Sequence, residues 1–426
     1  MIDWRAEYAA LAERIVPRAP AARPLLAGFN ACVDHVYRID GDVLDRLAEA
    51  AARGGRALPG GLAAEILDRI GGGRDGEVFV PAPELQPWLA ELLGEPRTRQ
   101  VGGTGAQAAW TLAVLGAPAV LALTDRSATQ LSVLDPAIGL CAGHEVQPVG
   151  ATTPAGLAAK PPHFILEFTA GTRWHGGTVP RSSRIILRLA AEGIDRDADF
   201  AALTPKLVAG AGAGLASGLN TLPEDDTESR RWMHEVVDRW RDAGLPLIHL
   251  ELAEYPRPAV AADTAAEYTG TANSLGLSLT ELTALRTGRS HPAAAARDLA
   301  CRYGFDRVAV HADTWSLVVH RGDPEAASVA VRTGNLLAAA RARQGVPTAY
   351  LAVADDARFT TDHPAGGPLG DGWRCECAPT PYLAGPAATI GLGDTFVAGL
   401  LLADCLPGES ASVTVAEPSP SERRAS

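Results

Sequence analysis

Apolar residues recur along the chain at two spacings, one typical of helices and one typical of buried strands. Trp4, Tyr8, Leu11 and Ile15 follow helical spacing and predict an amphipathic helix over residues 4–15. In the second half of the chain, short apolar runs alternate with helical patterns, which predicts a mostly parallel sheet covered by helices on both faces. The expected strands are 24–30, 119–123, 215–218, 246–252 and 307–311. The segment 42–70 is also helical in pattern, with glycine breaks at 54–55 and 60–61. The other expected helices are 84–93, 108–115, 228–243, 279–286 and 293–303.

Two apolar runs near the middle of the chain do not follow this alternation. Residues 163–168 and 184–189 are β-like and are joined by a polar loop, so we expect them to pair as a hairpin in a separate small sheet. A chain of 426 residues is long enough for two or three domains, or for one large α/β unit with an appendage. The segment 406–426 is rich in Ser, Pro, Glu and Arg, and we expect it to be disordered.

Composition and charge narrow the classes of partner. Hydrophobic residues make up 47% of the chain and charged residues 21%, which is ordinary for a globular protein. The formal net charge is −12 and the chain contains no block of five or six basic residues, so we expect neither nucleic acid nor a membrane surface as a partner. The N-terminus lacks the basic and apolar segments of a signal peptide, so we expect a cytoplasmic protein.

The six cysteines are scattered along the sequence. Only Cys375 and Cys377 lie close together, and Cys-x-Cys alone is not a usual zinc pattern. We therefore expect reduced thiols rather than a disulfide framework.

A glycine-rich turn precedes an apolar helix near the C-terminus, in the segment Thr389-Ile-Gly-Leu-Gly-Asp394-Thr. The start of such a helix offers free backbone N–H groups and the positive end of the helix dipole, which together bind anions. Glycines let an anion approach the backbone because they carry no Cβ. Asp394 is either a helix cap or a base that faces a substrate hydroxyl. An anion site beside a base is the arrangement that phosphoryl transfer needs.

A second candidate segment, Gly28-Phe-Asn30-Ala-Cys-Val-Asp34, directly follows the first core strand. Ligands of open α/β sheets bind at the carboxyl ends of strands. Asn30 and Asp34 can hydrogen-bond sugar hydroxyls there, or they can form an Asx-type turn.

The third candidate segment is Val101-Gly-Gly-Thr-Gly-Ala-Gln107. It fits a loose form of the dinucleotide-binding fingerprint, with Asp125 at a plausible later distance. Residues 97–101 do not make the apolar strand that this fingerprint must follow, so a Rossmann-type dehydrogenase is the weakest alternative. No Gly-Lys-Ser/Thr follows, which excludes a Walker A loop.

Together these segments resemble the ribokinase-like sugar kinases, and the stretches between them are similar to the family of ADP-dependent glucokinases and phosphofructokinases. The similar stretches keep the family's order and rough spacing over about residues 25–402. They are Gly28–Asp34, His163–Phe168, Pro180–Ile186, Ser217–Asn220, His249–Ala253, Ser274–Leu277 and Pro386–Thr395. The Thr-Ile-Gly-Leu-Gly-Asp-Thr string and the His-Leu-Glu string are the most specific of them.

The resemblance implies a catalytic role for the C-terminal motif. Asp394 would be the general base that takes the proton from a sugar hydroxyl. The amides of Gly391, Leu392 and Gly393 would hold the oxygens of the phosphoryl group in transfer.

The resemblance also implies a set of sugar contacts. Asn30 and Asp34 would bind sugar hydroxyls, and the mid-chain pair Gly102 and Gly103 would lie against the sugar. Glu77 is similar to an acidic sugar contact of the glucokinase branch.

Three charged residues are implied in nucleotide and metal binding. Glu251 would help to organise Mg²⁺, through water, and its alternative is a strand-end carboxylate paired with an arginine. Arg184 would reach the ADP phosphates, and its alternative is a solvated strand residue. Where the family carries Asn-x-x-Glu as a second Mg²⁺ organiser, this chain has Ser278-Leu-Thr-Glu281, and Ser183 replaces a family Asn. These departures affect the expected metal geometry and nucleotide preference.

The implied fold is a ribokinase-like α/β core, a mostly parallel sheet flanked by helices, with a smaller β-rich lid. The core would comprise 1–30, 101–158 and 200–405, the lid 31–100 and 159–199, and the disordered tail 406–426. The implied reaction transfers the β-phosphate of ADP to a sugar hydroxyl in the presence of Mg²⁺ and releases AMP. Lid closure would exclude water, which competes with the sugar as acceptor. A monomer or small homo-oligomer is expected.

Several alternatives stay open at the level of sequence. The donor could be ATP on the same fold, or the protein could be a non-catalytic sugar- or nucleotide-binding relative, which the Ser278 substitution allows. The acceptor could be glucose or fructose 6-phosphate. A sugar phosphate needs cations, for which the expected lid offers Arg173, Arg181, Arg184 and Arg188. A free sugar would rely on Asn30, Asp34 and Glu77.

Overall fold

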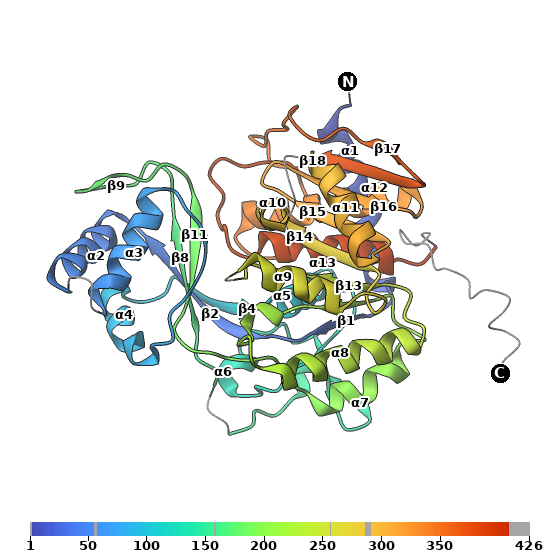
Figure 1. Ribbon diagram of the computed structural model, residues 1–426, viewed down its shortest axis with the longest axis horizontal. Helices are drawn as coiled ribbons and strands as arrows, with labels where there is room; N and C mark the ends of the chain where they lie inside the picture. The colour runs from blue at the N-terminus through green and yellow to red at the C-terminus, as the bar shows by residue number, and fades with distance from the viewer. Residues whose placement is uncertain (1, 55–57, 157–158, 256, 286–290, 409–426) are drawn as a thin grey trace, which may run out of the picture.

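Two β-sheets organise the computed structural model, which describes residues 2–54, 58–156, 159–255, 257–285 and 291–408. The larger sheet and its helices lie at the right of Figure 1, and the smaller sheet with its own helices lies at the left. Within the described residues, no helix combines the length and the apolar composition needed to cross a membrane.

The larger sheet has eleven strands in the order β17-β18-β16-β15-β14-β13-β12-β1-β5-β6-β7. Every pairing from β15 to β6 is parallel, whereas the pairings at both edges are antiparallel. The parallel strands are β1 (Leu25–Gly28), β5 (Ala119–Leu121), β6 (Gly139–Ala142), β12 (Ala213–Ala216), β13 (Ile248–Glu251), β14 (Ser274–Ser278) and β15 (Arg307–His311), and the edge strands are β7 (Glu145–Pro148), β16 (Trp315–His320), β17 (Gly367–Gly370) and β18 (Trp373–Pro379). Strands β1 and β12 are buried at every residue, as expected for a sheet covered on both faces.

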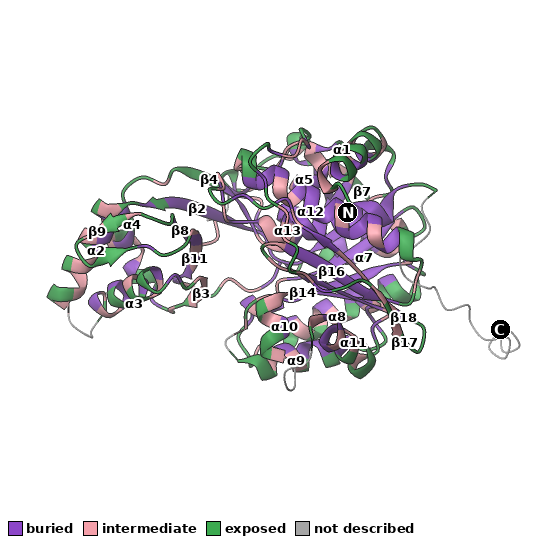
Figure 2. Cartoon of the chain, turned by 90° about the horizontal axis from the view of Figure 1, so that it is seen from above, coloured by how far each residue is buried: buried purple, intermediate pink, exposed green. Residues whose placement is uncertain are grey.

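Helices cover both faces of the larger sheet, and Figure 2 shows the buried strands between the two helical layers. Each layer has its own apolar core. One layer contains α1 (Trp4–Ile15), α5 (Thr104–Val114), α12 (Pro324–Gln344) and α13 (Leu392–Cys405), and the other contains α7 (Ala198–Leu207), α8 (Thr227–Asp242), α9 (Pro258–Glu267), α10 (Leu279–Leu285) and α11 (Pro292–Tyr303). A short helix, α6 (Ala128–Leu131), and four 3-10 turns (Val16–Ala21, Pro83–Leu85, Val149–Ala151 and Leu219–Thr221) complete the helical elements among the described residues.

The smaller sheet has five strands in the order β3-β11-β8-β2-β4. They are β2 (Cys32–Ile39), β3 (Gly76–Phe79), β4 (Thr98–Gly102), β8 (His163–Phe168) and β11 (Ser183–Arg188), and a two-stranded ribbon, β9 (Arg173–Trp174) with β10 (Gly177–Thr178), extends beyond them. Helices α2 (Gly41–Gly54), α3 (Gly60–Gly71) and α4 (Gln86–Leu93) pack on one face through Leu44, Ile66 and Leu89. The opposite face packs Val36 and Ile165 against Ile390, which belongs to the turn before α13.

The predicted α/β class is confirmed, as are the helix over 4–15 and the antiparallel pairing of 163–168 with 184–189, which begins at Ser183 opposite Phe168. Because the strands of the smaller sheet come from two separate stretches of chain, we propose the core and lid ranges given above as its domain division. The tail expected over 406–426 lies outside the described residues from 409 onward, and Leu406 itself is buried. Residues 55–57, at the expected helix break, also lie outside the described residues.

Two strands differ from the sequence expectation. The segment expected as a turn at Gly28–Asp34 enters strand β2 at Cys32, so Asp34 is a strand residue. Residues 97–101 were not expected to form an apolar strand, and the strand β4 that covers Thr98–Gly102 is polar in its first half. Its first two residues are exposed because β4 is the edge of the smaller sheet, which explains the polar sequence. The dinucleotide fingerprint still fails. Strand β4 belongs to the smaller sheet, whereas the following helix α5 packs on the larger sheet. In a Rossmann unit the helix packs on the same sheet as the strand that precedes it.

Candidate active site

The glycine turn before α13 forms the centre of the candidate site. Gly391 caps the helix in a left-handed conformation with φ of 74°, which glycine adopts without strain. Helix α13 begins at Leu392, so the amides of its first turn have no carbonyl partner within the helix. Asp394 lies in this first turn and is partly exposed. The structure therefore places a carboxylate beside free N–H groups at the positive end of a buried helix.

A buried arginine that the sequence analysis missed lies directly behind this turn. Arg341 comes from α12, is 0% exposed, and donates from Nη1 to Gln107 Oε1 at 2.7 Å and to Thr395 Oγ1 at 3.0 Å. A Cβ on Gly391 would lie 2.3 Å from its Cζ and Nη2 atoms, so the guanidinium packs against the glycine backbone. Nε and Nη2 are buried and make no hydrogen bond. Burial lowers the pKa of Arg341 to about 10, and the charge of Asp394 opposes this effect.

The smaller sheet contacts the turn before α13, at Thr389 and Ile390, through Glu167 on β8. Glu167 Oε1 accepts hydrogen bonds from Thr389 N at 2.6 Å, from Thr389 Oγ1 at 2.8 Å and from Ile390 N at 3.2 Å. A polar cleft of about 280 Å³ opens beside this contact, and Arg38 and Arg97 are among its lining residues. The position of the turn therefore depends on the smaller sheet, a coupling that the sequence did not reveal.

Arg184 lies opposite Glu167 in the register of β11 with β8. Its charge lowers the pKa values of His311 and Arg341. Its Nε atom is buried and makes no hydrogen bond. An arginine so placed can bind a phosphate group that enters between the two sheets.

The expected sugar contacts converge at the end of β1. Asn30 is 3% exposed and its Oδ1 is buried without a hydrogen bond, and Asp34 is also 3% exposed. The two glycines pack against them, because a Cβ on Gly102 would lie 2.2 Å from Asp34 Oδ1 and one on Gly103 would lie 2.1 Å from Asn30 O. The structure thus brings together Asn30, Asp34, Gly102 and Gly103, and only glycine fits at the last two positions.

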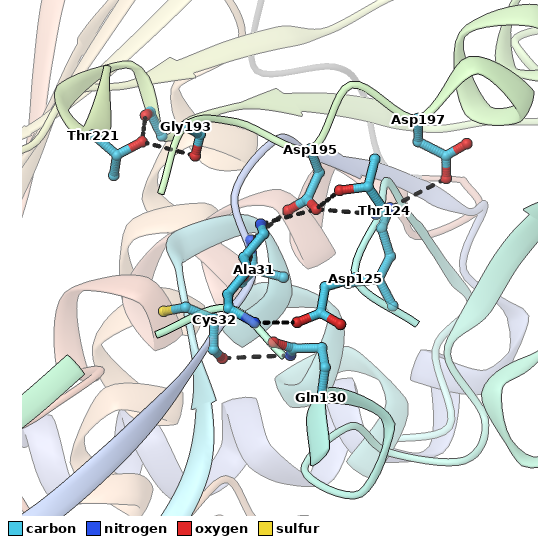
Figure 3. A network of polar contacts seen from close by, with 12 residues as sticks. Ala31, Cys32, Thr124, Asp125, Gln130, Gly193, Asp195, Asp197 and Thr221 are labelled. Atoms are coloured by element: carbon cyan, nitrogen blue, oxygen red, sulfur yellow. Dashed lines mark hydrogen bonds and ion pairs between the residues drawn. The ribbon is translucent and has the colours of Figure 1, made fainter. Parts of the chain in front are cut away.

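A polar network fixes the chain where it crosses from the larger sheet to the smaller one (Figure 3). Asp195 accepts hydrogen bonds from Ala31 N at 2.8 Å and from Thr124 Oγ1 at 2.6 Å. Lys160 bridges Asp195 Oδ1 at 2.9 Å and Ala31 O at 3.0 Å. Ala31 lies between Asn30 and Asp34, so this network positions both.

Glu77 lies at the boundary of the two sheets, on β3. It forms an ion pair with Arg188 at 2.7 Å and accepts a hydrogen bond from Asn220 Nδ2 at 3.1 Å. Burial raises the pKa of Glu77, and the charges of Arg188 and His163 oppose that rise.

Of the two expected metal organisers, Glu251 ends strand β13 and Glu281 lies in the first turn of α10, directly after the neighbouring strand β14. Glu251 Oε2 accepts from His249 Nε2 at 2.8 Å, and its Oε1 lies 3.5 Å from His311 Nε2. Burial raises the pKa of Glu251 and of Glu281, and each carboxylate has a further carboxylate among its neighbours. Burial lowers the pKa of His311, and the charges of Glu281 and Asp394 oppose this effect.

Ser278 and Glu281 also have a structural role. Glu281 N donates to Ser278 Oγ at 3.2 Å, and Ser278 N donates to Glu281 Oε2 at 2.7 Å. These reciprocal bonds form a capping box at the start of α10. The pattern Ser-x-x-Glu signals this box, so the departure from the family motif preserves the helix cap.

Known proteins show the same fold. A family model described as the conserved region of ADP-specific phosphofructokinase/glucokinase matches residues 23–403. No curated protein matches the chain at a significant level. A structure of an ADP-dependent kinase in complex with fructose-6-phosphate and ADPβS has a TM-score of 0.78 at 16% identity, over 96% of this chain and 100% of that one.

Two further solved structures are similar over most of their length. The last common ancestor of ADP-dependent phosphofructokinases from Methanosarcinales gives a TM-score of 0.71 at 17% identity, covering 96% of this chain and 99% of that chain. A phosphofructokinase from Pyrococcus horikoshii OT3 with AMP gives 0.69 at 16% identity, covering 90% and 97%. The family model confirms the resemblance predicted from the sequence. Since it spans most of the chain, the chain belongs to the ADP-specific phosphofructokinase/glucokinase family and is a phosphotransferase that acts on a hydroxyl group.

Proposed function

We propose that this protein transfers the β-phosphoryl group of ADP to a hydroxyl of a sugar and releases AMP. The observation that carries this proposal is the turn at Gly391, where the free amides of α13 and the Asp394 carboxylate share one partly exposed surface. The positive helix end suits the phosphoryl oxygens, and the carboxylate suits the proton of the attacking hydroxyl.

Each part of the site then has a role. Asp394 accepts the hydroxyl proton, and the amides of Gly391, Leu392 and Gly393 hold the oxygens of the moving phosphoryl group. Arg341, buried behind the turn, adds positive potential to the same place without contacting solvent.

Binding and orientation fall to residues of both sheets. Asn30 and Asp34 hold the sugar, and Gly102 and Gly103 pack so closely against these two residues that a Cβ has no room. Arg184 binds the ADP phosphates from the smaller sheet. Glu167 joins the smaller sheet to the turn before α13 through its bonds from Thr389, and so excludes water from this turn.

The residues present fit a magnesium ion. Glu251 is buried and Glu281 is half-buried, and both are hard oxygen donors whose pKa values rise on desolvation, so a divalent cation would relieve the cost of their charge. Such an ion supplies charge neutralisation for the phosphate oxygens. Glu251 is oriented by His249, whose Nδ1 lies 2.8 Å from Ser274 Oγ, and both carboxylates would act mostly through water.

The acceptor favoured by the geometry is an unphosphorylated hexose such as glucose. A sugar phosphate needs unpaired cations, but Glu77 neutralises Arg188 at 2.7 Å and Asp75 neutralises Arg181. Glu77 can instead accept a sugar hydroxyl. Fructose 6-phosphate is the second candidate, because opening the Glu77–Arg188 pair would free one buried arginine.

A donor and acceptor panel tests the proposal. Purified protein is incubated with Mg²⁺, either ADP or ATP, and either glucose or fructose 6-phosphate, and nucleotide products are separated by chromatography. We expect AMP to form from ADP in a sugar-dependent reaction, faster with glucose. Turnover with ATP alone would instead identify an ATP-dependent kinase on this fold, and ligand binding without any product would identify a non-catalytic relative.

A further inference from the structure

Three side chains that bind transition metals meet where the smaller sheet begins. Cys32 and Asp34 are two residues apart on β2, so they point to the same face. His163 is the first residue of β8 and pairs with Asp34 in the parallel register. Gly102 pairs with Cys32 from the other side, and its backbone packs closely against Cys32 and Asp34.

The ligand atoms of these side chains form a small triangle. Cys32 Sγ lies 3.6 Å from Asp34 Oδ1 and 3.4 Å from His163 Nδ1, and the latter two atoms are 3.4 Å apart. Atoms bound to a tetrahedral Zn²⁺ at their usual lengths, about 2.0–2.3 Å, lie about 3.3–3.6 Å from one another. The triangle therefore already has the size of one face of a zinc coordination tetrahedron. A Cβ at Gly102 would lie 2.6 Å from Cys32 Sγ, so any other residue would obstruct this face.

Glu192 contacts the second ring nitrogen of His163. Glu192 Oε1 lies 2.5 Å from His163 Nε2, an ion-pair contact that leaves Nδ1 as the ring nitrogen facing the triangle. Glu192 Oε2 is buried without a hydrogen bond, and the side chain is 2% exposed. A carboxylate that holds the distal nitrogen is the usual support of a metal-bound histidine. Among the described residues, Cys32, His163 and Glu192 are the group of His, Cys, Asp or Glu residues close enough together to hold a metal ion.

We propose that Cys32, Asp34 and His163 bind Zn²⁺, with Glu192 as the outer support of His163. The cluster is desolvated, with Cys32 at 0%, Asp34 at 3% and His163 at 7% exposure. A thiolate with an imidazole selects Zn²⁺ or Co²⁺ over Mg²⁺, so this site is chemically distinct from the carboxylates Glu251 and Glu281. The scattered cysteines of the sequence concealed it, because its ligands come from two strands far apart in the chain.

The site has a consequence for catalysis that rests on the proposed function. Asp34 is also a proposed sugar contact, so an ion on Oδ1 would withdraw it from the sugar. Zn²⁺ should therefore inhibit as a competitor of the sugar and not of ADP.

Cobalt spectroscopy tests the site without reference to activity. Full-length protein, freed of metal by a chelator, is titrated with Co²⁺ and then with Zn²⁺. We expect one equivalent of Co²⁺ to produce a thiolate-to-cobalt charge-transfer band that Zn²⁺ abolishes. Cys32→Ser should lose the band and keep its circular dichroism, and the matched buried variant Cys141→Ser should keep both. Glu192→Gln should retain the band with about 10–100-fold weaker affinity.

Two results would overturn the site, namely no charge-transfer band in the wild type, or an unchanged band in Cys32→Ser. A separate measurement addresses the sugar: saturating glucose should weaken Co²⁺ binding. A normal band that glucose leaves unaffected would support the metal site and overturn the sugar role of Asp34, so the two failures are distinguishable.

Discussion

Replacing Arg341 with Met separates the catalytic value of this buried cation from its effect on stability. The pKa of Arg341 falls to about 10 because the side chain is buried, and at 1.36 kcal/mol per pKa unit the charge costs about 3 kcal/mol relative to an exposed arginine. Met fills a similar volume and carries no charge. The substitution removes this cost and also removes the bonds to Gln107 Oε1 and Thr395 Oγ1.

The two effects on stability oppose each other. Each lost hydrogen bond from a charged donor is worth about 1.5–3 kcal/mol. We therefore expect the free energy of unfolding of Arg341→Met to lie within about 2 kcal/mol of wild type, the lost bonds and the lost charge nearly cancelling. The positive potential behind Gly391 disappears, and a loss of this kind costs about 10²–10³-fold in kcat. KM for the sugar should change little, because Arg341 does not contact it in the proposed arrangement.

Urea unfolding and steady-state kinetics of the same preparations provide the assay. Arg343→Met is the matched control, because Arg343 lies on the same helix and is exposed; it should leave both quantities unchanged. Arg341→Lys restores the charge without the planar fork and should recover part of kcat. A variant Arg341→Met with wild-type kcat would refute the electrostatic role. A loss of stability well above 4 kcal/mol would refute the cancellation.

Three other substitutions test separate parts of the site. Glu167→Ala removes the acceptor of the hydrogen bonds from Thr389. Without these bonds the turn before α13 is less well positioned, so kcat at saturating substrates should fall about tenfold or more. A wild-type kcat would contradict the coupling of the two sheets. Glu77→Ala frees Arg188, so the ratio of kcat/KM for fructose 6-phosphate to that for glucose should rise about tenfold, which is 1.4 kcal/mol; an unchanged ratio would remove Glu77 from acceptor selection. Glu251→Gln should raise the Mg²⁺ concentration for half-maximal activity about 10–100-fold, determined by magnesium titration at fixed ADP, and an unaltered requirement would argue against this residue as a metal organiser.

Local features of the site were predictable from sequence, because they depend on neighbouring residues. A glycine turn followed by an apolar helix determines the free amides around Asp394 without reference to the rest of the fold. The same holds for the helix over 4–15, whose apolar spacing shows directly. The capping box of Ser278 and Glu281 was equally local, but its Ser-x-x-Glu spacing was interpreted only as an altered metal motif.

Features that depend on tertiary packing were not predictable. An arginine in an Ala-rich helical segment usually faces solvent, and only the packing of α12 against α13 buries Arg341. Strand β2 was missed because its polar residues include Asp34, which faces the site, and Arg38, which is exposed. The contact of Glu167 with Thr389 joins two sheets and leaves no mark in either segment. With Lys160 and Lys206 as the only lysines, almost every cation that could contact phosphate is an arginine, yet sequence alone did not show which ones are already paired.

The central claim is that Asp394 removes the hydroxyl proton while ADP donates its β-phosphoryl group. Phosphorus NMR of wild type and Asp394→Asn, each with ADP, Mg²⁺ and glucose, measures it most directly. We expect the wild type to form AMP and a sugar phosphate in equal amounts. The Asn variant should still bind ADP, shown by the same ADP-induced rise in melting temperature as in the wild type, while its turnover falls by about 10²–10⁴-fold. Near-normal AMP formation by a folded Asp394→Asn variant would contradict the claim.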